Sequence, residues 1–176
     1  MKVKAIDHKQ CDILVHELIN LWRGFTKIME EDWQQSSGKL GVTMSELHVL
    51  RIVYLEKEVP MSYIAKMGLW DLSTVMQLIK RLTKKELVIT TKKENDMRVS
   101  YVSLTEKGKV IFEQSRQYRS PLFSLIQQLY HSSEENKVLL QHVVAFQKWL
   151  NSHYHGPEYV NWIERTGSQL HEKFQK

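Results

Sequence analysis

The segment 61–104 combines two closely spaced helical patterns with two strand-like runs, and this order constrains the fold more than any other part of the chain. The second helical pattern places apolar residues at spacings of three and four, which is typical of one buried helical face: Val75, Leu78, Ile79 and Leu82. The first pattern begins after Pro60, a helix-start signal, and ends near Gly68, which permits a sharp turn. We therefore predict a helix-turn-helix, with Asp71 or Ser73 capping its second helix.

Two strand-like runs follow the helix-turn-helix directly. The run 88–92 (VITTK) is rich in β-branched residues, and the run 98–104 (RVSYVSL) is similar in character. The segment KENDM between them contains turn-forming residues, so we expect the chain to reverse there. Two antiparallel strands in this place form a wing, and Lys92, Lys93 and Arg98 make its tip basic. Such a tip can reach a phosphate backbone or a narrow minor groove.

The outward face of the second helix carries short hydroxyls, an amide and cations: Ser73, Thr74, Gln77, Lys80, Arg81 and Lys84. Amides and guanidinium groups pair with base edges, whereas hydroxyl and ammonium groups hold phosphates. A merely solvated amphipathic helix would show the same pattern, but the wing beside it favours an interface with double-stranded DNA. The residues expected to probe the major groove are Ser73, Thr74, Gln77 and Arg81. Those expected to hold phosphates are Lys80, Lys84, Lys92 and Lys93.

Positive charge is concentrated in this part of the chain. Residues 61–110 contain ten Lys and Arg residues against five Asp and Glu residues, and this excess equals the formal net charge of the whole chain, +5. The charges elsewhere therefore balance. A basic excess confined to one module is the electrostatic signature of a phosphate binder.

Helical patterns flank this module on both sides. The predicted helices span about 6–35, 43–56, 105–131, 133–154 and 158–174. Thr43 and Glu46 fit a capping box, and Pro121 should break the third of these helices near Ser120. Because the apolar stripes exceed what one small module can cover, we expect a homodimer. The second helix of the helix-turn-helix is the recognition helix, and a dimer presents two of them. Placed about 34 Å apart, they would enter successive major grooves of a pseudo-palindromic site.

The predicted fold is mainly α with a minor β component: a winged helix-turn-helix with long dimerisation helices at both ends. Its expected units are an amino-terminal dimerisation helix, the DNA-binding module and the carboxy-terminal dimerisation helices, at 1–40, 41–108 and 109–176. We expect these units to form one compact structure.

The wing and its continuation, NDMRVSYVSLTEKG, resemble the wing signature of the MarR family of bacterial transcription regulators. The matching positions are Asp96, Arg98, Leu104, Thr105 and Gly108. Within that family, EEDWQQ (30–35) and IAKMGLWDLSTV (64–75) resemble the Hpr (ScoC) group. The resemblance implies that Arg98 enters the minor groove and that Asp96 orients it. It also implies repression of genes for secreted proteases, sporulation or transport. The glycine that usually follows the recognition helix in the family is replaced by Glu86, so a left-handed helix end is less expected here.

The sequence shows no Gly-rich phosphate loop, nucleophile elbow or metal-spaced Cys/His cluster, so we expect neither an enzyme nor a cofactor or metal site. His153 and His155 alone are a weak metal signal. The single cysteine, Cys11, excludes an internal disulfide, and together with the polar amino-terminal segment it predicts a cytoplasmic protein.

Two alternatives remain open. One is a sensor that releases DNA when a phenolic ligand binds or when Cys11 is oxidised, as in many members of the resembled family. A ligand cleft in such a sensor would be lined by Trp22, His48 or Tyr54. The other alternative is a protein-interaction module whose winged fold binds no DNA.

Overall fold

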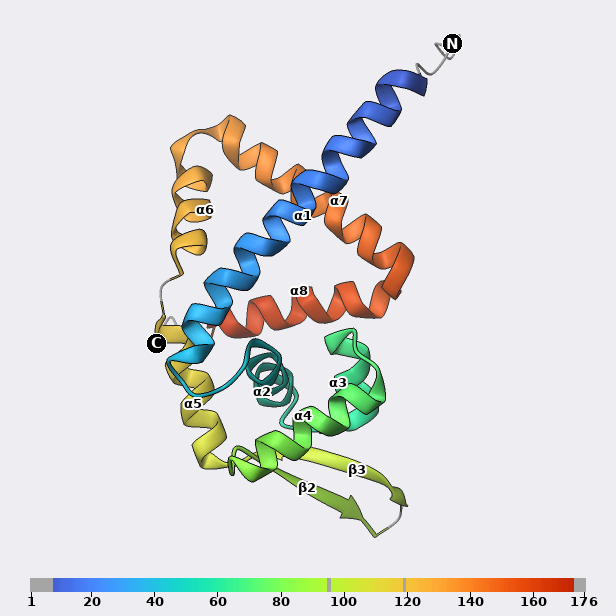
Figure 1. The fold of residues 1–176 in the computed structure, drawn as a ribbon, viewed down its shortest axis with the longest axis vertical. Coiled ribbons are helices and arrows are strands. Elements are labelled where there is room, and N and C mark those ends of the chain that lie inside the picture. Colours follow the sequence, from blue (N-terminus) through green and yellow to red (C-terminus); the bar gives the residue numbers. More distant parts are fainter. Residues whose placement is uncertain (1–7, 95, 119, 173–176) are drawn as a thin grey trace.

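A small sheet lies at one end of the molecule with helices packed beside it, and further helices extend away from it toward the other end (Figure 1). The computed structural model describes residues 8–94, 96–118 and 120–172, without the side chains of Ser36, Asp96 and Glu172. In chain order the elements are α1 (His8–Gly38), α2 (Met44–Glu56), β1 (Glu58–Pro60), α3 (Met61–Gly68), α4 (Leu72–Lys84), β2 (Val88–Lys93), β3 (Asp96–Leu104), α5 (Glu106–Gln117), α6 (Pro121–Ser132), α7 (Glu134–His155) and α8 (Pro157–Glu172). Among the described residues, no helix has the length and apolar character needed to span a lipid bilayer.

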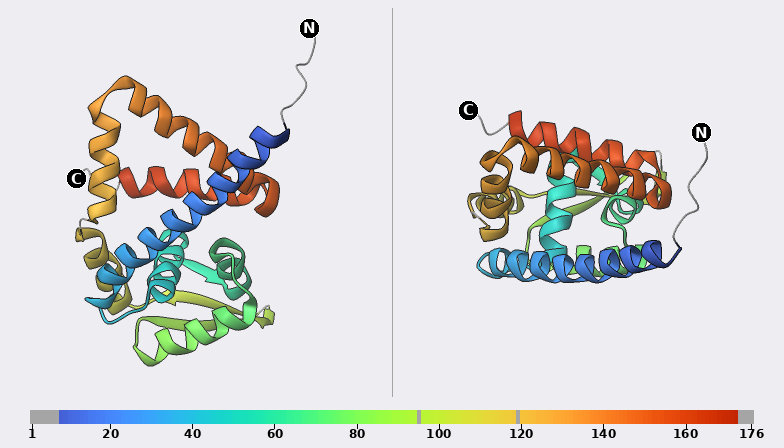
Figure 2. Two further views of the ribbon diagram at one scale, coloured as in Figure 1. Left: turned by 45° about the horizontal axis from the view of Figure 1, so that its top comes forward. Right: turned by 90° about the horizontal axis from the view of Figure 1, so that it is seen from above.

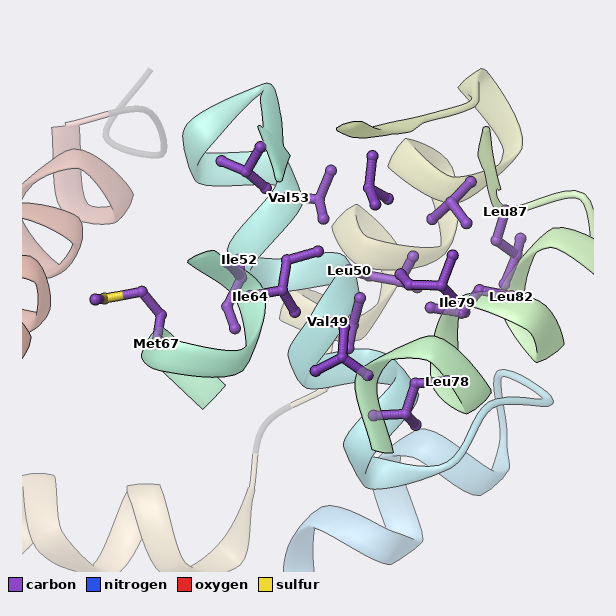
Figure 3. Close-up of a cluster of buried hydrophobic side chains, with 14 of the residues drawn as sticks. Val49, Leu50, Ile52, Val53, Ile64, Met67, Leu78, Ile79, Leu82 and Leu87 are labelled. Atoms are coloured by element: carbon purple, nitrogen blue, oxygen red, sulfur yellow. The ribbon is translucent and has the colours of Figure 1, made fainter. Parts of the chain in front are cut away.

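The predicted helix-turn-helix is present, and it packs on α2. The buried face of α4 consists of the four residues expected from the sequence, Val75, Leu78, Ile79 and Leu82. They meet α2, which is buried on most of its circumference, and Ile64 of α3 (Figure 3). Burial of each such side chain contributes about 1.5–3 kcal/mol. α4, the recognition helix, therefore packs on a continuous apolar surface, which holds it in one orientation.

The amino terminus of α2 has the predicted capping box. The Glu46 backbone N–H donates to Thr43 Oγ1 at 3.2 Å, and the Thr43 N–H donates to Glu46 Oε2 at 2.8 Å. These two bonds satisfy backbone donors that the first turn of a helix leaves free.

Within the described residues, the strands form a three-stranded antiparallel sheet in the order β1-β3-β2. Thr91 of β2 lies opposite Tyr101 of β3, and the register shifts between Lys92 and Lys93 near the tip. β1 pairs with the other edge of β3 and was not predicted. A strand of three residues is too short to show alternation, and its Pro60 disfavours a strand on sequence grounds.

The turn between α3 and α4 differs from the expectation for Gly68. The left-handed residue is Leu69, with a φ of 55°, whereas Gly68 remains within α3. Gly68 is required for another reason: a Cβ atom there would overlap the ring of Trp70. The glycine thus permits the close approach of an aromatic ring and not the unusual backbone angle.

The end of α4 contradicts the expectation that Glu86 would make a left-handed conformation less favoured. Glu86 has a φ of 62°. The Leu87 N–H donates to the Leu82 carbonyl and the Glu86 N–H to the Thr83 carbonyl, both at 2.9 Å. This pair of bonds is a Schellman motif, which satisfies the last carbonyls of the helix. The hydrogen bonds and the burial of Leu87 outweigh the strain of a non-glycine residue in this conformation.

The outer helices begin and end close to the predicted positions. Pro121 is the first residue of α6, and the hydroxyls of Ser120 and Ser133 cap α6 and α7. α1 extends three residues beyond the predicted end, to Gly38, and the predicted ends at residues 6 and 174 lie outside the described residues.

α8 returns to the winged module and packs on it, as two further views show (Figure 2). Its Trp162 joins the buried core and donates from Nε1 to Glu56 Oε1 at 2.9 Å, and Arg165 pairs with the same carboxylate. Lys66 of α3 also pairs with Glu158 of α8. Part of the carboxy-terminal surface expected to meet a second copy is therefore covered by the chain itself.

Candidate nucleic-acid interface

The outward face of α4 is the centre of the candidate interface. All six polar residues expected on it, Ser73, Thr74, Gln77, Lys80, Arg81 and Lys84, are exposed, and they lie away from the buried apolar face. Exposed Leu72 and Met76 border this face. Because α4 lies beside the β2–β3 hairpin, at the end of the molecule opposite α6 and α7, helix and hairpin form one continuous surface (Figure 1).

The cations on α4 differ in their surroundings. Within the described residues, Lys80 and Lys84 have no acidic partner and project into solvent. Arg81 is held by a buried acid, since its Nε lies 3.3 Å from Glu46 Oε1. Lys85, one residue beyond the helix, donates to Glu46 Oε2 at 2.7 Å. Sequence reasoning missed both contacts with Glu46, because they join residues 35 and 39 positions apart that no local pattern connects.

The wing places its predicted cations at the edge of the sheet. Lys92, Lys93 and Arg98 are all exposed. Lys93 pairs with Glu58 of β1 at 2.8 Å, and its Nζ lies 4.1 Å from the centre of the Tyr101 ring. The hydrogen bond to Glu58 raises the pKa of Lys93 above its usual value, so this residue stays charged. The Asp96 side chain lies outside the described residues, and its expected contact with Arg98 stays a prediction.

The Leu-Thr-x-x-Gly motif joins the base of the wing to the recognition helix. Thr105 caps α5 by accepting from the Gly108 N–H at 3.0 Å, and its hydroxyl donates to the Glu86 carbonyl at 2.7 Å. Gly108 is buried, and a Cβ atom there would overlap the Leu87 carbonyl. The end of α4, the wing and the start of α5 are therefore fixed to one another.

A cleft of about 280 Å³ lies behind this interface, between α1, α2, α5 and Leu170 of α8. Of the three residues expected to line such a cleft, only His48 does so. Trp22 instead stacks on Phe146, and Tyr54 lies against Phe112, with ring centres 5.4 and 4.4 Å apart. Sequence reasoning missed two further lining residues, Asp32 and Arg116, because they come from helices far apart in the chain.

The cleft carries buried polar groups. Within the described residues, Asp32 Oδ2, His48 Nε2 and Arg51 Nε are buried without a hydrogen-bond partner. Burial, together with the positive charge of Arg51, lowers the pKa of His48 to about 4. His48 is therefore neutral at neutral pH.

The structure also places the residues that were considered for redox and metal chemistry. Cys11 is exposed on α1. His153 stacks beside Trp149, whereas His155 lies against Tyr159. Over the described ranges, no group of three or more His, Cys, Asp or Glu side chains is arranged to hold a metal ion.

A recognition helix and a basic wing on one surface define the class of winged helix-turn-helix transcription regulators. Residues 33–115 match the family model described as transcriptional regulator SarA/Rot. The chain is 30% identical over 177 residues to the HTH-type transcriptional regulator Hpr of Halalkalibacterium halodurans, covering 97% of this chain and 88% of that protein. It belongs to the Hpr family of HTH-type transcriptional regulators, which is a family of regulators and not of enzymes.

Other similarities agree with this assignment. The DNA-binding transcriptional repressor ScoC of Bacillus subtilis is 32% identical over 129 residues, covering 71% of this chain and 64% of ScoC. The structure of the YusO protein from Bacillus subtilis is similar with a TM-score of 0.52 at 29% identity, covering 82% of this chain and 97% of that one. Mutant MarR from E. coli complexed with operator DNA has the same fold, with a TM-score of 0.59 at 21% identity, covering 75% and 96% of the two chains. The resemblance to MarR proteins seen in the sequence is thus confirmed, as is the predicted fold class.

Proposed function

We propose that the protein represses transcription as a homodimer that binds a pseudo-palindromic site in double-stranded DNA. The observation that carries this proposal is the separation of polar and apolar residues onto opposite faces of α4. Val75, Leu78, Ile79 and Leu82 are buried in the module, and the hydroxyl, amide and cationic residues of α4 are all exposed beside a basic hairpin. The relatives named Hpr and ScoC, the latter a DNA-binding transcriptional repressor, support the same proposal.

Each part of this surface has a role that follows from its chemistry. α4 enters the major groove, where Ser73, Thr74, Gln77 and Arg81 reach base edges. Phosphates are held by Lys80, Lys84, Lys92 and Lys93. Arg98 enters the minor groove, with Asp96 as the residue that orients it. Cations are favoured in a narrow minor groove because its negative potential is enhanced.

The dimer forms through helices that leave the module. α1, α6 and α7 expose large apolar side chains, which a monomer would leave in water. They include Leu14, Leu18, Leu21, Phe25 and Ile28 on α1, Phe123, Leu125 and Leu129 on α6, and Val143, Phe146 and Trp149 on α7. Packing these faces against a second copy buries them and sets the distance between the two recognition helices.

A gel-shift assay tests the proposal. Purified protein is titrated onto fragments of its own genome, with an excess of unrelated competitor DNA. We expect a small set of fragments from promoters to be retained, and the repressor role predicts higher expression of the adjacent genes when the protein is absent. Genes for secreted proteases and sporulation are the expected targets. Protein that retains no fragment at low salt would instead support the interaction module.

The cleft favours a second candidate function, release of DNA on binding a small molecule. It combines the cations Arg51 and Arg116 with the aromatic residues Trp33, Phe112 and Tyr118, so an aromatic carboxylic acid is complementary to it. Hydroxybenzoates should raise the melting temperature of the wild-type protein and weaken its DNA binding. An Arg51→Gln variant should respond less. Equal responses of the two proteins would exclude the cleft as the site, and DNA release by peroxide would indicate Cys11 instead.

A further inference from the structure

Glu46 is a buried carboxylate with more partners than a helix cap requires. Only 1% of its side chain is exposed. Its Oε2 accepts from the Thr43 N–H and from Lys85 Nζ, at 2.8 and 2.7 Å. Its Oε1 accepts from Arg81 Nε at 3.3 Å. The capping box needs the first of these bonds, whereas the other two connect α2 to the recognition helix.

The surroundings keep this carboxylate charged. Burial alone would raise the pKa of Glu46, but it is outweighed by the hydrogen bonds from Lys85, Thr43 and Arg81 and by the charge of Lys85, so the pKa lies below its usual value. A buried anion is favourable only when it is paired and hydrogen-bonded. The carboxylate is therefore a fixed anchor, held from α2, from the loop before it and from the end of α4.

The contact with Arg81 is made through one edge of the guanidinium group. The bond uses Nε, and 51% of the Arg81 side chain remains exposed. Within the described residues, the two terminal Nη groups have no acidic partner. An arginine held at Nε keeps a planar pair of donors directed outward, which is the geometry that binds a guanine edge or a phosphate through two hydrogen bonds. A free arginine would lose more side-chain entropy on forming the same contact.

We infer that Glu46 is a positioning residue for DNA recognition, which holds Arg81 at Nε so that its Nη pair meets the DNA. This inference rests on the proposed DNA-binding function. Glu46 itself is too deeply buried to touch the duplex, and it acts through Arg81. The same anchor joins the α1–α2 loop to α4, since Lys85 also donates to the Gly41 carbonyl at 2.9 Å.

The experiment uses the full-length protein and a duplex that the wild type selects from a random-sequence library. The affinities of each variant for this duplex and for a shuffled version of it are measured by fluorescence anisotropy. Glu46→Gln keeps the capping box, because glutamine also serves at this position. The preference is the ratio of the affinity for the selected duplex to the affinity for the shuffled one. Glu46→Gln should lower this preference about tenfold, the size expected for one charge-assisted hydrogen bond. Affinity for the shuffled duplex should stay equal or rise, since a negative charge is lost.

Three further variants separate positioning from a structural role. In an Arg81→Ala background, Glu46→Gln should lower the preference no further. Lys85→Gln removes the other cation from the same carboxylate and should leave the preference within about twofold. Arg81→Lys keeps the charge but lacks both Nε and the planar fork, and it should lose the preference as Glu46→Gln does. This last variant is at an exposed position, so it tests the inference even if Glu46→Gln does not fold.

Each outcome decides one question. The inference is overturned if Glu46→Gln keeps the preference, if its effect is undiminished without Arg81, if Lys85→Gln has the same effect, or if Arg81→Lys keeps the full preference. A wild type that selects no duplex overturns the proposed function itself. A wild type that selects one, with variants that do not differ from it, overturns only the role of Glu46.

Discussion

Glu86 holds a backbone conformation that side chains rarely adopt, at the point where the recognition helix meets the wing. Glu86→Gly should raise the free energy of unfolding by about 0.5–1 kcal/mol, because glycine adopts a positive φ without steric cost. The variant also loses the exposed ion pair between Glu86 and Lys107, which contributes little to stability. Urea denaturation measures the change.

Lys84→Gly is the matched control for Glu86→Gly. Lys84 is the last residue of α4, with ordinary helical geometry, and glycine there should destabilise the protein. If both variants were destabilised equally, the left-handed conformation of Glu86 would carry no strain.

His48 makes stability depend on pH. Its pKa is lowered to about 4 in the folded protein, against about 6.5 in an unfolded chain. Between these values the unfolded chain binds a proton that the folded protein does not, so stability falls as the pH falls through this window. From about pH 7 to about pH 5 the loss should be about 2 kcal/mol.

A His48→Gln variant is the control for this pH dependence. It lacks the titrating group, so urea denaturation should show a smaller loss of stability between the same two pH values. The exposed histidines are unchanged in this variant and cancel in the comparison. An identical pH response of the two proteins would contradict a buried neutral His48.

At the scale of elements, local patterns predicted most helices and caps. The spacing of apolar residues defined the buried face of α4, and the Thr43–Glu46 pair defined the start of α2. Pro121 indicated the break between α5 and α6. Each of these signals acts within a few residues, where backbone geometry alone decides the outcome.

Features that depend on distant segments were not predictable in the same way. β1 is a strand only because β3 offers it an edge, with Val59 opposite Val102. The sequence pattern around Glu46 indicated only a helix cap, and no neighbouring residue indicated its contact with Arg81. The apolar residues of α8 predicted a buried face but not that this face would pack on the module of the same chain. The predicted DNA-facing residues were found exposed together, because helical periodicity determines which side of α4 they occupy.

The junction of wing and α5 allows a test at this scale. Gly108→Ala should lower the free energy of unfolding by about 2 kcal/mol, because the new methyl group meets the Leu87 backbone, which cannot move without shifting the wing. Thermal unfolding measures the change. Gly167→Ala in α8 is the control, since its Cβ meets no atom within 4 Å and alanine favours a helix. A neutral Gly108→Ala would show that the junction is loosely packed.

At the scale of the whole molecule, the exposed apolar faces of α1, α6 and α7 predict self-association. Leu21 is 73% exposed and lies in the apolar stripe of α1. Leu21→Glu should weaken the dimer more than about tenfold, because a buried unpaired charge is costly in an interface. Sedimentation equilibrium measures the mass.

Arg23→Glu provides the control for dimerisation, since Arg23 is exposed on the opposite side of α1. It should leave the dimer intact. A wild-type protein that sediments as a monomer at micromolar concentration would contradict the dimer, and so would a dimer that Leu21→Glu does not weaken.

The central claim is that α4 and the wing bind duplex DNA through cations on one surface of a symmetric dimer. The most direct test is the affinity of the wild type and of Arg98→Ala for a selected duplex, measured over a range of salt concentrations. About six to ten phosphates neutralised per dimer predict a logarithmic salt slope of about −5 to −9. Arg98→Ala should weaken binding by about 1–3 kcal/mol. Affinity that does not change with salt, or binding unaffected by the loss of Arg98, would contradict the account.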